Sequence, residues 1–189
     1  MLNDTSTYLS ALRTRRSGKP RDLIAPGPDA HECRAMIEIA ARTPDHGKLA
    51  PWRFVLVPPE RRDAFAELLT DARRSEGELK PGELDGLAQF ARQAPALIVV
   101  LSSPSTERPI PLWEQQMSAG AALMNLLHAA HAHGYAAGWL TGWASESERV
   151  RDAFGRDPER IVGFVFIGTP ARALEERPRP DLTRIVAEW

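Results

Sequence analysis

The sequence predicts a single α+β domain. Helical and strand-like segments are mixed along its 189 residues without the strict βαβ alternation of a parallel α/β fold. The run 96–101 is continuously apolar, which is typical of a central strand covered on both faces. This length suits one domain with a substantial core, and no internal repeat or low-complexity linker divides the chain. We therefore expect one domain over residues 1–189.

Two helices and a strand are predicted in the first third. Residues 5–14 form a short helix with apolar side chains on one side, and Asp29 can cap a second helix that runs to about Ala41. The apolar run 54–57 is typical of a buried strand, which the two prolines after it end.

The middle of the chain alternates helices with the central strand. Residues 60–74 and 82–93 have amphipathic helical patterns, and the strand 96–101 follows them. The longest helix is predicted over 112–133, with small apolar residues that indicate close packing. Gly134 ends this helix in the position that favours glycine.

The last third contains a strand and an extended end. After a short apolar segment over 136–139, Ser145 with Glu148 matches a capping box and predicts a helix start. Residues 161–168 are predicted to form a strand. Residues from about 173 to 189 contain Pro178 and Pro180 and end in the apolar Ile185, Val186 and Trp189, and we expect an extended C-terminal arm.

Composition excludes several classes of protein. The formal net charge of −1 argues against a general nucleic-acid binder, which needs a basic excess. No apolar run approaches the ~20 residues of a membrane span, and the N-terminus lacks the pattern of a signal peptide. Cys33 is the only cysteine and lies on an apolar helix face, which favours a buried hydrophobe over a nucleophile. We expect a cytoplasmic protein without internal disulfides.

The segment 13–17 contains three arginines and a serine at a helix end. Arg15, Arg16 and Ser17 could form a phosphate clamp, because guanidinium groups donate in pairs to phosphate oxygens. A solvated basic helix end is the more common meaning of such a pattern.

The loop 41–52 has the densest chemistry in the chain. Arg42, Asp45 and His46 lie close together in it, between a predicted helix and a predicted strand. Loops carry binding residues more often than regular elements do. The simpler alternative is a connection that Pro44 and Gly47 force to turn.

Three further patterns are less specific. The glycines in 138–143 would allow a backbone to approach a flat ligand closely, although their spacing alone favours a plain turn between a strand and a helix. Gly120 inside the long helix costs ~1 kcal/mol against alanine, so we expect something to pack on its face. The three histidines in 128–133 do not share one helical side, and we predict no metal site.

Five blocks in this order resemble the nitroreductase family of flavin enzymes, and within it the YdjA-like subgroup. They are 15–17, 41–52, 113–120, 138–142 and 161–170. The resemblance implies a sandwich with a mostly antiparallel sheet flanked by helices, in an intertwined homodimer with FMN at the interface. It also implies that the arm over about 173–189 wraps onto the partner subunit.

The resemblance further implies the roles of individual residues. Arg15, Arg16 and Ser17 would hold the FMN phosphate and ribityl end, with Arg172 as a further candidate for the phosphate. Arg42 and His46 would reach the flavin from the other subunit. The backbone along the ring would be that of Leu140, Thr141 and Gly142.

Two departures from the family pattern bear on substrate range. Asp45 and His46 stand where many relatives have a serine and an asparagine, and Ala50 stands in place of a glutamine. Leu140 stands where the subgroup often has an arginine, so we predict a less electropositive pocket.

The implied function is an FMN-dependent oxidoreductase. Hydride would pass from NAD(P)H through flavin N5 to a nitroaromatic, a quinone or a similar acceptor by a ping-pong route, with no side chain acting as a catalytic base. The alternatives are a flavin-binding protein without turnover, for storage or sensing, and other flavin chemistry such as reductive dehalogenation.

Overall fold

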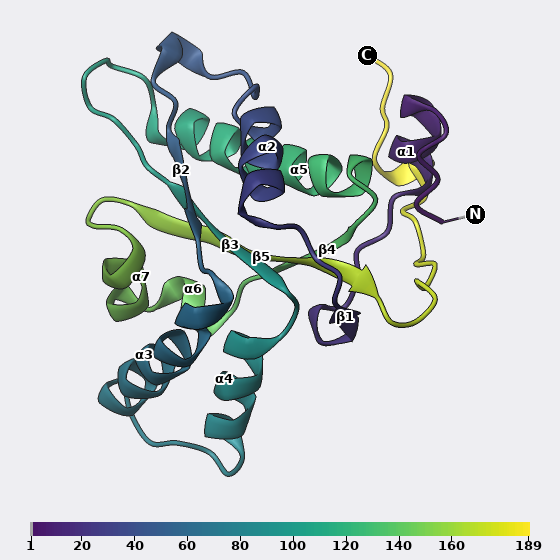
Figure 1. The fold of residues 1–189 in the computed structure, drawn as a ribbon. Helices are drawn as coiled ribbons and strands as arrows, with labels where there is room; N and C mark the ends of the chain where they lie inside the picture. The colour runs from purple at the N-terminus through teal and green to yellow at the C-terminus, as the bar shows by residue number, and fades with distance from the viewer. Residues whose placement is uncertain (1) are drawn as a thin grey trace.

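The computed structural model describes residues 2–189 and has a five-stranded sheet with helices on both faces (Figure 1). The strands are β1 (Leu23–Ile24), β2 (Trp52–Leu56), β3 (Ala96–Ser102), β4 (Ala136–Leu140) and β5 (Arg160–Pro170). The α-helices are α1 (Tyr8–Thr14), α2 (Ala30–Ala40), α3 (Arg62–Ser75), α4 (Glu83–Arg92), α5 (Leu112–Ala132), α6 (Trp143–Glu146) and α7 (Glu148–Phe154).

Strand β5 is the centre of the sheet. It pairs with β3 along one edge and with β4 and the two-residue β1 along the other, and β2 completes the sheet beyond β3. All of these pairs are antiparallel, with one irregularity in the register of β3 between Val100 and Leu101. The α+β class and the mostly antiparallel sheet are therefore confirmed.

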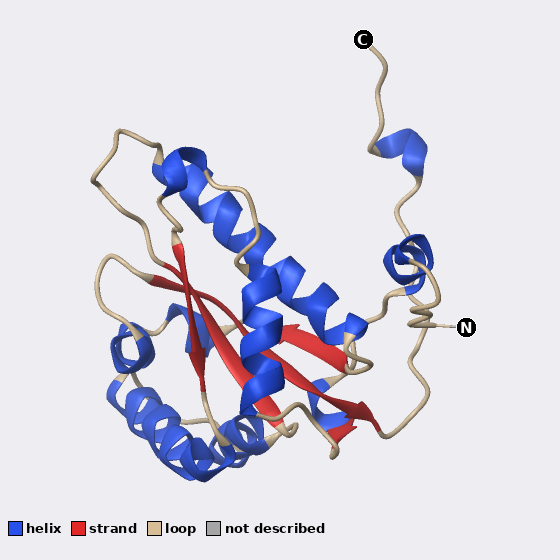
Figure 2. Ribbon diagram, turned by 45° about the horizontal axis from the view of Figure 1, so that its top comes forward, coloured by secondary structure: helices blue, strands red, loops and turns tan. Residues whose placement is uncertain are grey.

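The helices form two layers that enclose the sheet. Helices α2 and α5 cover one face, and α3, α4, α6 and α7 lie on the other (Figures 1 and 2). Alternate residues of β3 divide between the two faces: Val99 packs with the α3 and α4 side, and Ile98 packs with the α2 and α5 side. Every residue of β3 is buried, as its continuous apolar run predicts.

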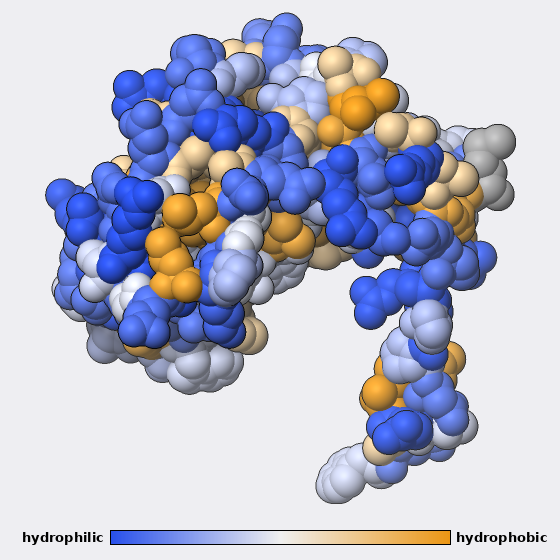
Figure 3. All heavy atoms as spheres, turned by 90° about the horizontal axis from the view of Figure 1, so that it is seen from below, coloured by the Kyte–Doolittle hydropathy of each residue, from blue (hydrophilic) through white to orange (hydrophobic). Residues whose placement is uncertain are grey.

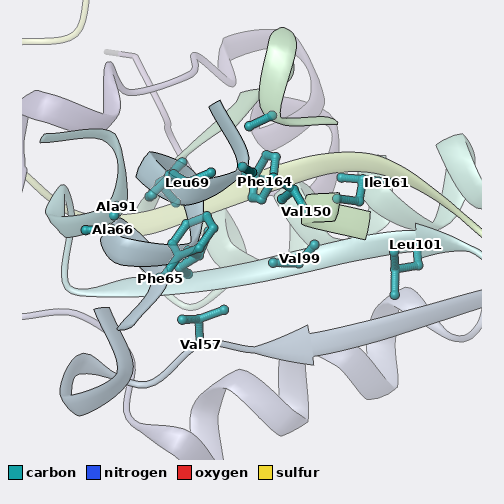
Figure 4. Close-up of a cluster of buried hydrophobic side chains, with 14 of the residues drawn as sticks. Val57, Phe65, Ala66, Leu69, Ala91, Val99, Leu101, Val150, Ile161 and Phe164 are labelled. Carbon is teal, nitrogen blue, oxygen red and sulfur yellow. The ribbon is translucent and has the colours of Figure 1, made fainter. Parts of the chain in front are cut away.

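Aromatic side chains dominate the core under α3 and α4. The Phe65 ring stacks on Phe164 at 5.8 Å between centroids, and Phe90 meets Phe164 and Phe166 edge-on. Figure 4 shows Phe65, Leu69 and Phe164 pointing into this layer above β3. This packing anchors the α3–α4 hairpin whose inner side reaches the site described below.

Most predicted boundaries agree with the structure, and one cap is wrong. Ser145 does not begin a helix; it lies within α6, and Ser147 caps α7 by accepting a hydrogen bond from the Val150 N–H at 3.3 Å. The Ser147 hydroxyl also donates to Glu76 at the end of α3, at 2.5 Å. A contact with a residue far away in the sequence thus helps to decide which serine is the cap. Gly134, with φ of 86°, follows α5 as predicted.

The C-terminal segment leaves the body after it crosses the edge of the sheet. Figure 3 shows this end of the chain standing away from the rest, with apolar surface on it. Its exposed apolar side chains are Leu182, Ile185, Val186 and Trp189. Wrapping of this arm onto a partner stays a prediction. Among residues 2–189, no helix has both the length and the apolar character needed to span a membrane.

Candidate functional site

A cavity of about 610 Å³ lies where the segment after α1 meets the end of β5 and the C-terminal segment. Its walls are formed by residues 15–19, 21–23, 170, 172–177 and 179, with Gln89 of α4. We call it the cationic cavity. It brings together four of the predicted site residues, Arg15, Arg16, Ser17 and Arg172, from two ends of the sequence.

The segment after α1 brings the Arg15 and Ser17 side chains together. Arg15 has extended dihedral angles at the end of α1, and in extended backbone residues i and i+2 share a side. The Arg15 guanidinium donates to the Ser17 hydroxyl at 3.3 Å. The intervening Arg16 also lines the cavity, but it is only 7% exposed. Arg15 and Ser17 therefore form one polar pair, and Arg16 belongs to another set of contacts.

Positive charge dominates the cationic cavity. Seven arginine and lysine side chains line it against three carboxylates, which leaves an excess of four positive charges. Burial, followed by the charges of Arg179, Arg16 and Arg177, lowers the pKa of Arg15. An anion there would relieve this repulsion, and clustered guanidinium groups suit phosphate oxygens. The donor set therefore fits a phosphate group.

Carboxylates of the C-terminal segment already pair with part of this charge. Glu176 forms a two-point ion pair with Arg16, through the guanidinium Nε and one Nη. Lys19 donates to both oxygens of Glu175, at 2.9 and 3.0 Å. Arg172 is 80% exposed and its Nε lies 3.9 Å from Asp22, so it remains available to a ligand.

A second cavity of about 570 Å³ continues from the first. It lies between residues 17–21, the inner side of α4 and residues 138–140 of β4. Residues that line both cavities are Ser17, Gly18, Lys19, Arg21 and Gln89. Phe90, Trp139 and Leu140 give its far end apolar and aromatic surface. A ligand with an anionic end and a flat ring end matches this change along the two cavities.

Strand β4 is held close to the residues that separate the cavities. The Gly18 N–H donates to the Ala137 carbonyl at 3.0 Å. A Cβ on Gly138 would lie 2.5 Å from the Gly18 carbonyl oxygen, so only glycine allows this approach. Leu140 ends β4 within the second cavity, and Thr141 and Gly142 follow it at the start of α6. Gly142 has φ of 98°, a conformation that favours glycine.

His46 lies far from the cationic cavity within one chain. His46 Nδ1 lies 2.8 Å from Glu114 Oε2, in the first turn of α5. Arg15 lies at the opposite end, where its charge lowers the pKa of His128 and His131, after the larger effect of burial. A helix of 21 residues is about 30 Å long. One chain therefore does not bring His46 to the residues around Arg15.

Specific contacts shape the loop. The Ala50 N–H donates to Asp45 Oδ2 at 2.9 Å, which closes the turn over His46. The Ser118 hydroxyl of α5 donates to the Pro44 carbonyl at 2.8 Å, and Asn125 donates to the buried Thr43 hydroxyl at 2.7 Å. Asp45 thus acts on the backbone, while His46 remains largely exposed.

Sequence reasoning missed several residues of the cationic cavity. Lys19 and Arg21 come directly after the predicted clamp, and Arg177 and Arg179 lie in the C-terminal segment. The alternation of arginine with proline over 177–180 was a signal that could have identified the last two. No cluster of three or more metal-binding side chains occurs within residues 2–189.

Comparisons with known proteins bear on this site. A sequence model of the Nitroreductase family matches residues 12–169. The chain is 35% identical to YdjA of Escherichia coli K12, assigned as an NAD(P)H nitroreductase, over 167 residues, or 86% of this chain and 87% of YdjA.

Two solved structures share the fold. One is a nitroreductase-like protein from Bacillus cereus, with a TM-score of 0.80 and 21% identity over 97% of this chain and 96% of that one. The other is a nitroreductase in complex with FMN from Desulfovibrio desulfuricans, with a TM-score of 0.72 and 24% identity over 96% of this chain and 95% of that one. By its sequence and its fold, this chain belongs to the nitroreductase family.

Proposed function

We propose that this protein is an FMN-dependent oxidoreductase that uses NAD(P)H. The observation that carries the proposal is the pair of continuous cavities, one cationic and one apolar and aromatic at its far end. When bound, FMN would accept hydride from NAD(P)H and pass electrons to a nitroaromatic, a quinone or a similar acceptor. The similarity to YdjA and to an FMN complex of the same fold supports this assignment.

The cationic cavity would hold the phosphate end of the cofactor. Arg15 and Ser17 point together from the segment after α1, and Arg172 faces them from the segment after β5. Guanidinium groups donate paired hydrogen bonds to phosphate oxygens, and the Ser17 hydroxyl adds one more donor. The excess of positive charge would also favour the anionic reduced form of a flavin nearby.

The second cavity would hold the ring. Leu140, Thr141 and Gly142 lie where β4 ends, so their backbone can run along a flat ligand. Leu140 contributes no charge, and it packs partly against the aromatic core. We expect a pocket that accepts apolar, planar electron acceptors, since no charged side chain lies at its far end.

Completion of the site would require a second copy of the chain. His46 is at the far end of α5 from the cationic cavity, and neither it nor Arg42 lines that cavity, so in a homodimer both would face the other subunit's flavin. The outer side of α5 exposes Leu112, Trp113 and Met117. No atom lies within 4 Å of a Cβ placed on Gly120, so its close partner is not found within the described chain. These features support an α5-centred interface.

The test is to purify the protein and record its absorbance. A flavin spectrum that NADH or NADPH bleaches, and that a nitroaromatic or quinone restores, is expected. Arg15→Gln should lose FMN more readily, while Arg13→Gln, an exposed neighbour outside the cavity, should not. A protein that is colourless and takes up no added FMN would refute the proposal. Bound FMN without turnover would support the flavin-storage alternative.

A further inference from the structure

The contacts of Arg16 differ from those of a phosphate ligand. Its Nε and one Nη donate to Glu176, and its other Nη donates to the Arg15 and Arg13 carbonyl oxygens at 2.8 and 3.4 Å. The residue is 7% exposed. Four hydrogen bonds to the chain itself therefore occupy the guanidinium group that the sequence pattern assigned to a ligand.

Glu176 is equally occupied by its own chain. Besides Arg16, its carboxylate accepts from the Arg177 N–H at 2.9 Å and lies 3.5 Å from Arg179 Nη2. These donors, with the bonds from Arg16 as the largest effect, lower the pKa of Glu176 to about 2. The carboxylate is ionised at neutral pH and ties the C-terminal segment to the segment after α1.

The ion pair between Arg16 and Glu176 positions two further arginines. Arg177 and Arg179 both line the cationic cavity, and their charges act on Arg15. Each is followed by a proline, which restricts the backbone and limits the ways in which the pair can move away. The other ion pair between the C-terminal segment and the segment after α1 joins Lys19 to the neighbouring Glu175, and both of these side chains are exposed.

We propose that Arg16 is a positioning residue that latches Glu176, and that the latched segment supplies Arg177 and Arg179 as ligands for the phosphate of the cofactor. The anion site then has two halves: Arg15, Ser17 and Arg172 on the body, and the two arginines of the C-terminal segment. This inference rests on the proposed function, because it names the residues that would hold FMN.

The proposal makes a prediction opposite to simple charge counting. Glu176→Gln removes a negative charge from the cavity, so direct electrostatics predicts tighter binding of an anion. Loss of the latch predicts weaker binding, because Arg177 and Arg179 are no longer held in place. One charged hydrogen bond lost corresponds to about tenfold or more in affinity.

The experiment titrates apoprotein with FMN and, in parallel, with riboflavin, which lacks the phosphate. Flavin fluorescence gives both dissociation constants for the parent, Arg16→Gln, Glu176→Gln and the double variant. FMN should bind about tenfold more weakly in each, with riboflavin unchanged, and the double variant should be no weaker than either single one. Arg177→Gln and Arg179→Gln should also weaken FMN alone. Arg184→Gln, in the same segment but outside the cavity, is the matched control.

Three results would overturn the proposal. Tighter FMN binding by Glu176→Gln would mean that the carboxylate competes with the phosphate. Equal losses for FMN and riboflavin would mean a general structural role for Arg16. Additive losses in the double variant would mean that Arg16 and Glu176 act independently. Because Arg16 is buried and its variant can misfold, Glu176→Gln decides the sign, with circular dichroism as the check on folding.

A second measurement works without any flavin. A protease that cuts after glutamate should cleave Arg16→Gln after Glu175 or Glu176 faster than the parent, because the segment is no longer latched. Equal rates would refute the latch even if the protein bound no FMN. A parent that binds neither FMN nor riboflavin, with faster cleavage of the variant, would refute the proposed function and leave the latch supported.

Discussion

Gly138→Ala tests the contact that holds the two cavities together. The new Cβ would lie 2.5 Å from the Gly18 carbonyl oxygen and 2.8 and 2.9 Å from the Pro20 ring carbons. Ordinary contacts begin at 3.4 Å, so β4 and the segment at residues 18–20 must separate by about 0.9 Å. That separation strains the 3.0 Å hydrogen bond between Gly18 N–H and the Ala137 carbonyl.

The expected cost combines two effects. Overpacking costs about 1–3 kcal/mol, and a weakened backbone hydrogen bond adds about 1 kcal/mol. The free energy of unfolding should therefore fall by about 2–4 kcal/mol, which lowers Tm by about 5–15 °C in a protein of this size. FMN affinity should fall about tenfold or more, because residues 17–19 line both cavities and move with the strand.

Thermal unfolding by circular dichroism and FMN titration are the two assays. Gly86→Ala is the matched control for the stability assay alone, since this glycine lies inside α4 with no atom within 4 Å of a Cβ but also lines the second cavity. The control should gain about 0.5–1 kcal/mol from helix propensity. If Gly138→Ala melts within about 1 °C of the parent and retains FMN affinity, the close approach of β4 does not govern the site.

Three further predictions concern other regions. His131 is buried with no hydrogen-bond partner for either ring nitrogen among the described residues, and burial lowers its pKa to about 4. Because the unfolded state binds the proton between about pH 6.5 and 4 and the folded state does not, stability should fall by about 2 kcal/mol from pH 7 to pH 5. Urea unfolding should show this loss in the parent and not in His131→Leu. Burial raises the pKa of Cys33 to about 11, so iodoacetamide should alkylate it only after unfolding, as mass spectrometry of native and denatured samples would show. Trp113→Glu with Met117→Glu, on the exposed side of α5, should give a monomer by light scattering and abolish flavin retention; an unchanged dimer would place the interface elsewhere.

Local sequence patterns predicted the regular elements well. Strand β3 is buried on both faces, and its continuous apolar run indicates this. The residue after α5 has a left-handed backbone, which favours glycine. The error at Ser145 had a tertiary cause. Two serines were available as a cap, and Glu76 of α3 bonds to Ser147. A spacing rule carries no information about such a contact.

For the site, too, the sequence indicated some residues and missed others. Residue types alone indicated the arginines after α1, because a guanidinium group can bind phosphate in any fold. Arg172 was indicated by the resemblance to the family. The pattern did not separate Arg16, which bonds to Glu176, from Arg15 and Ser17, which bond to each other.

The sequence by itself determined the fold class, the order of the elements and the kind of chemistry, since periodicity and residue type act over a few neighbouring positions. Only the tertiary structure decided that Arg16 bonds to Glu176, that Arg177 and Arg179 join the cationic cavity, and that α5 separates His46 from it. The physical reason is that these contacts and distances depend on how the fold arranges segments that are far apart in the sequence. A charged pair 160 residues apart leaves no pattern in either local segment.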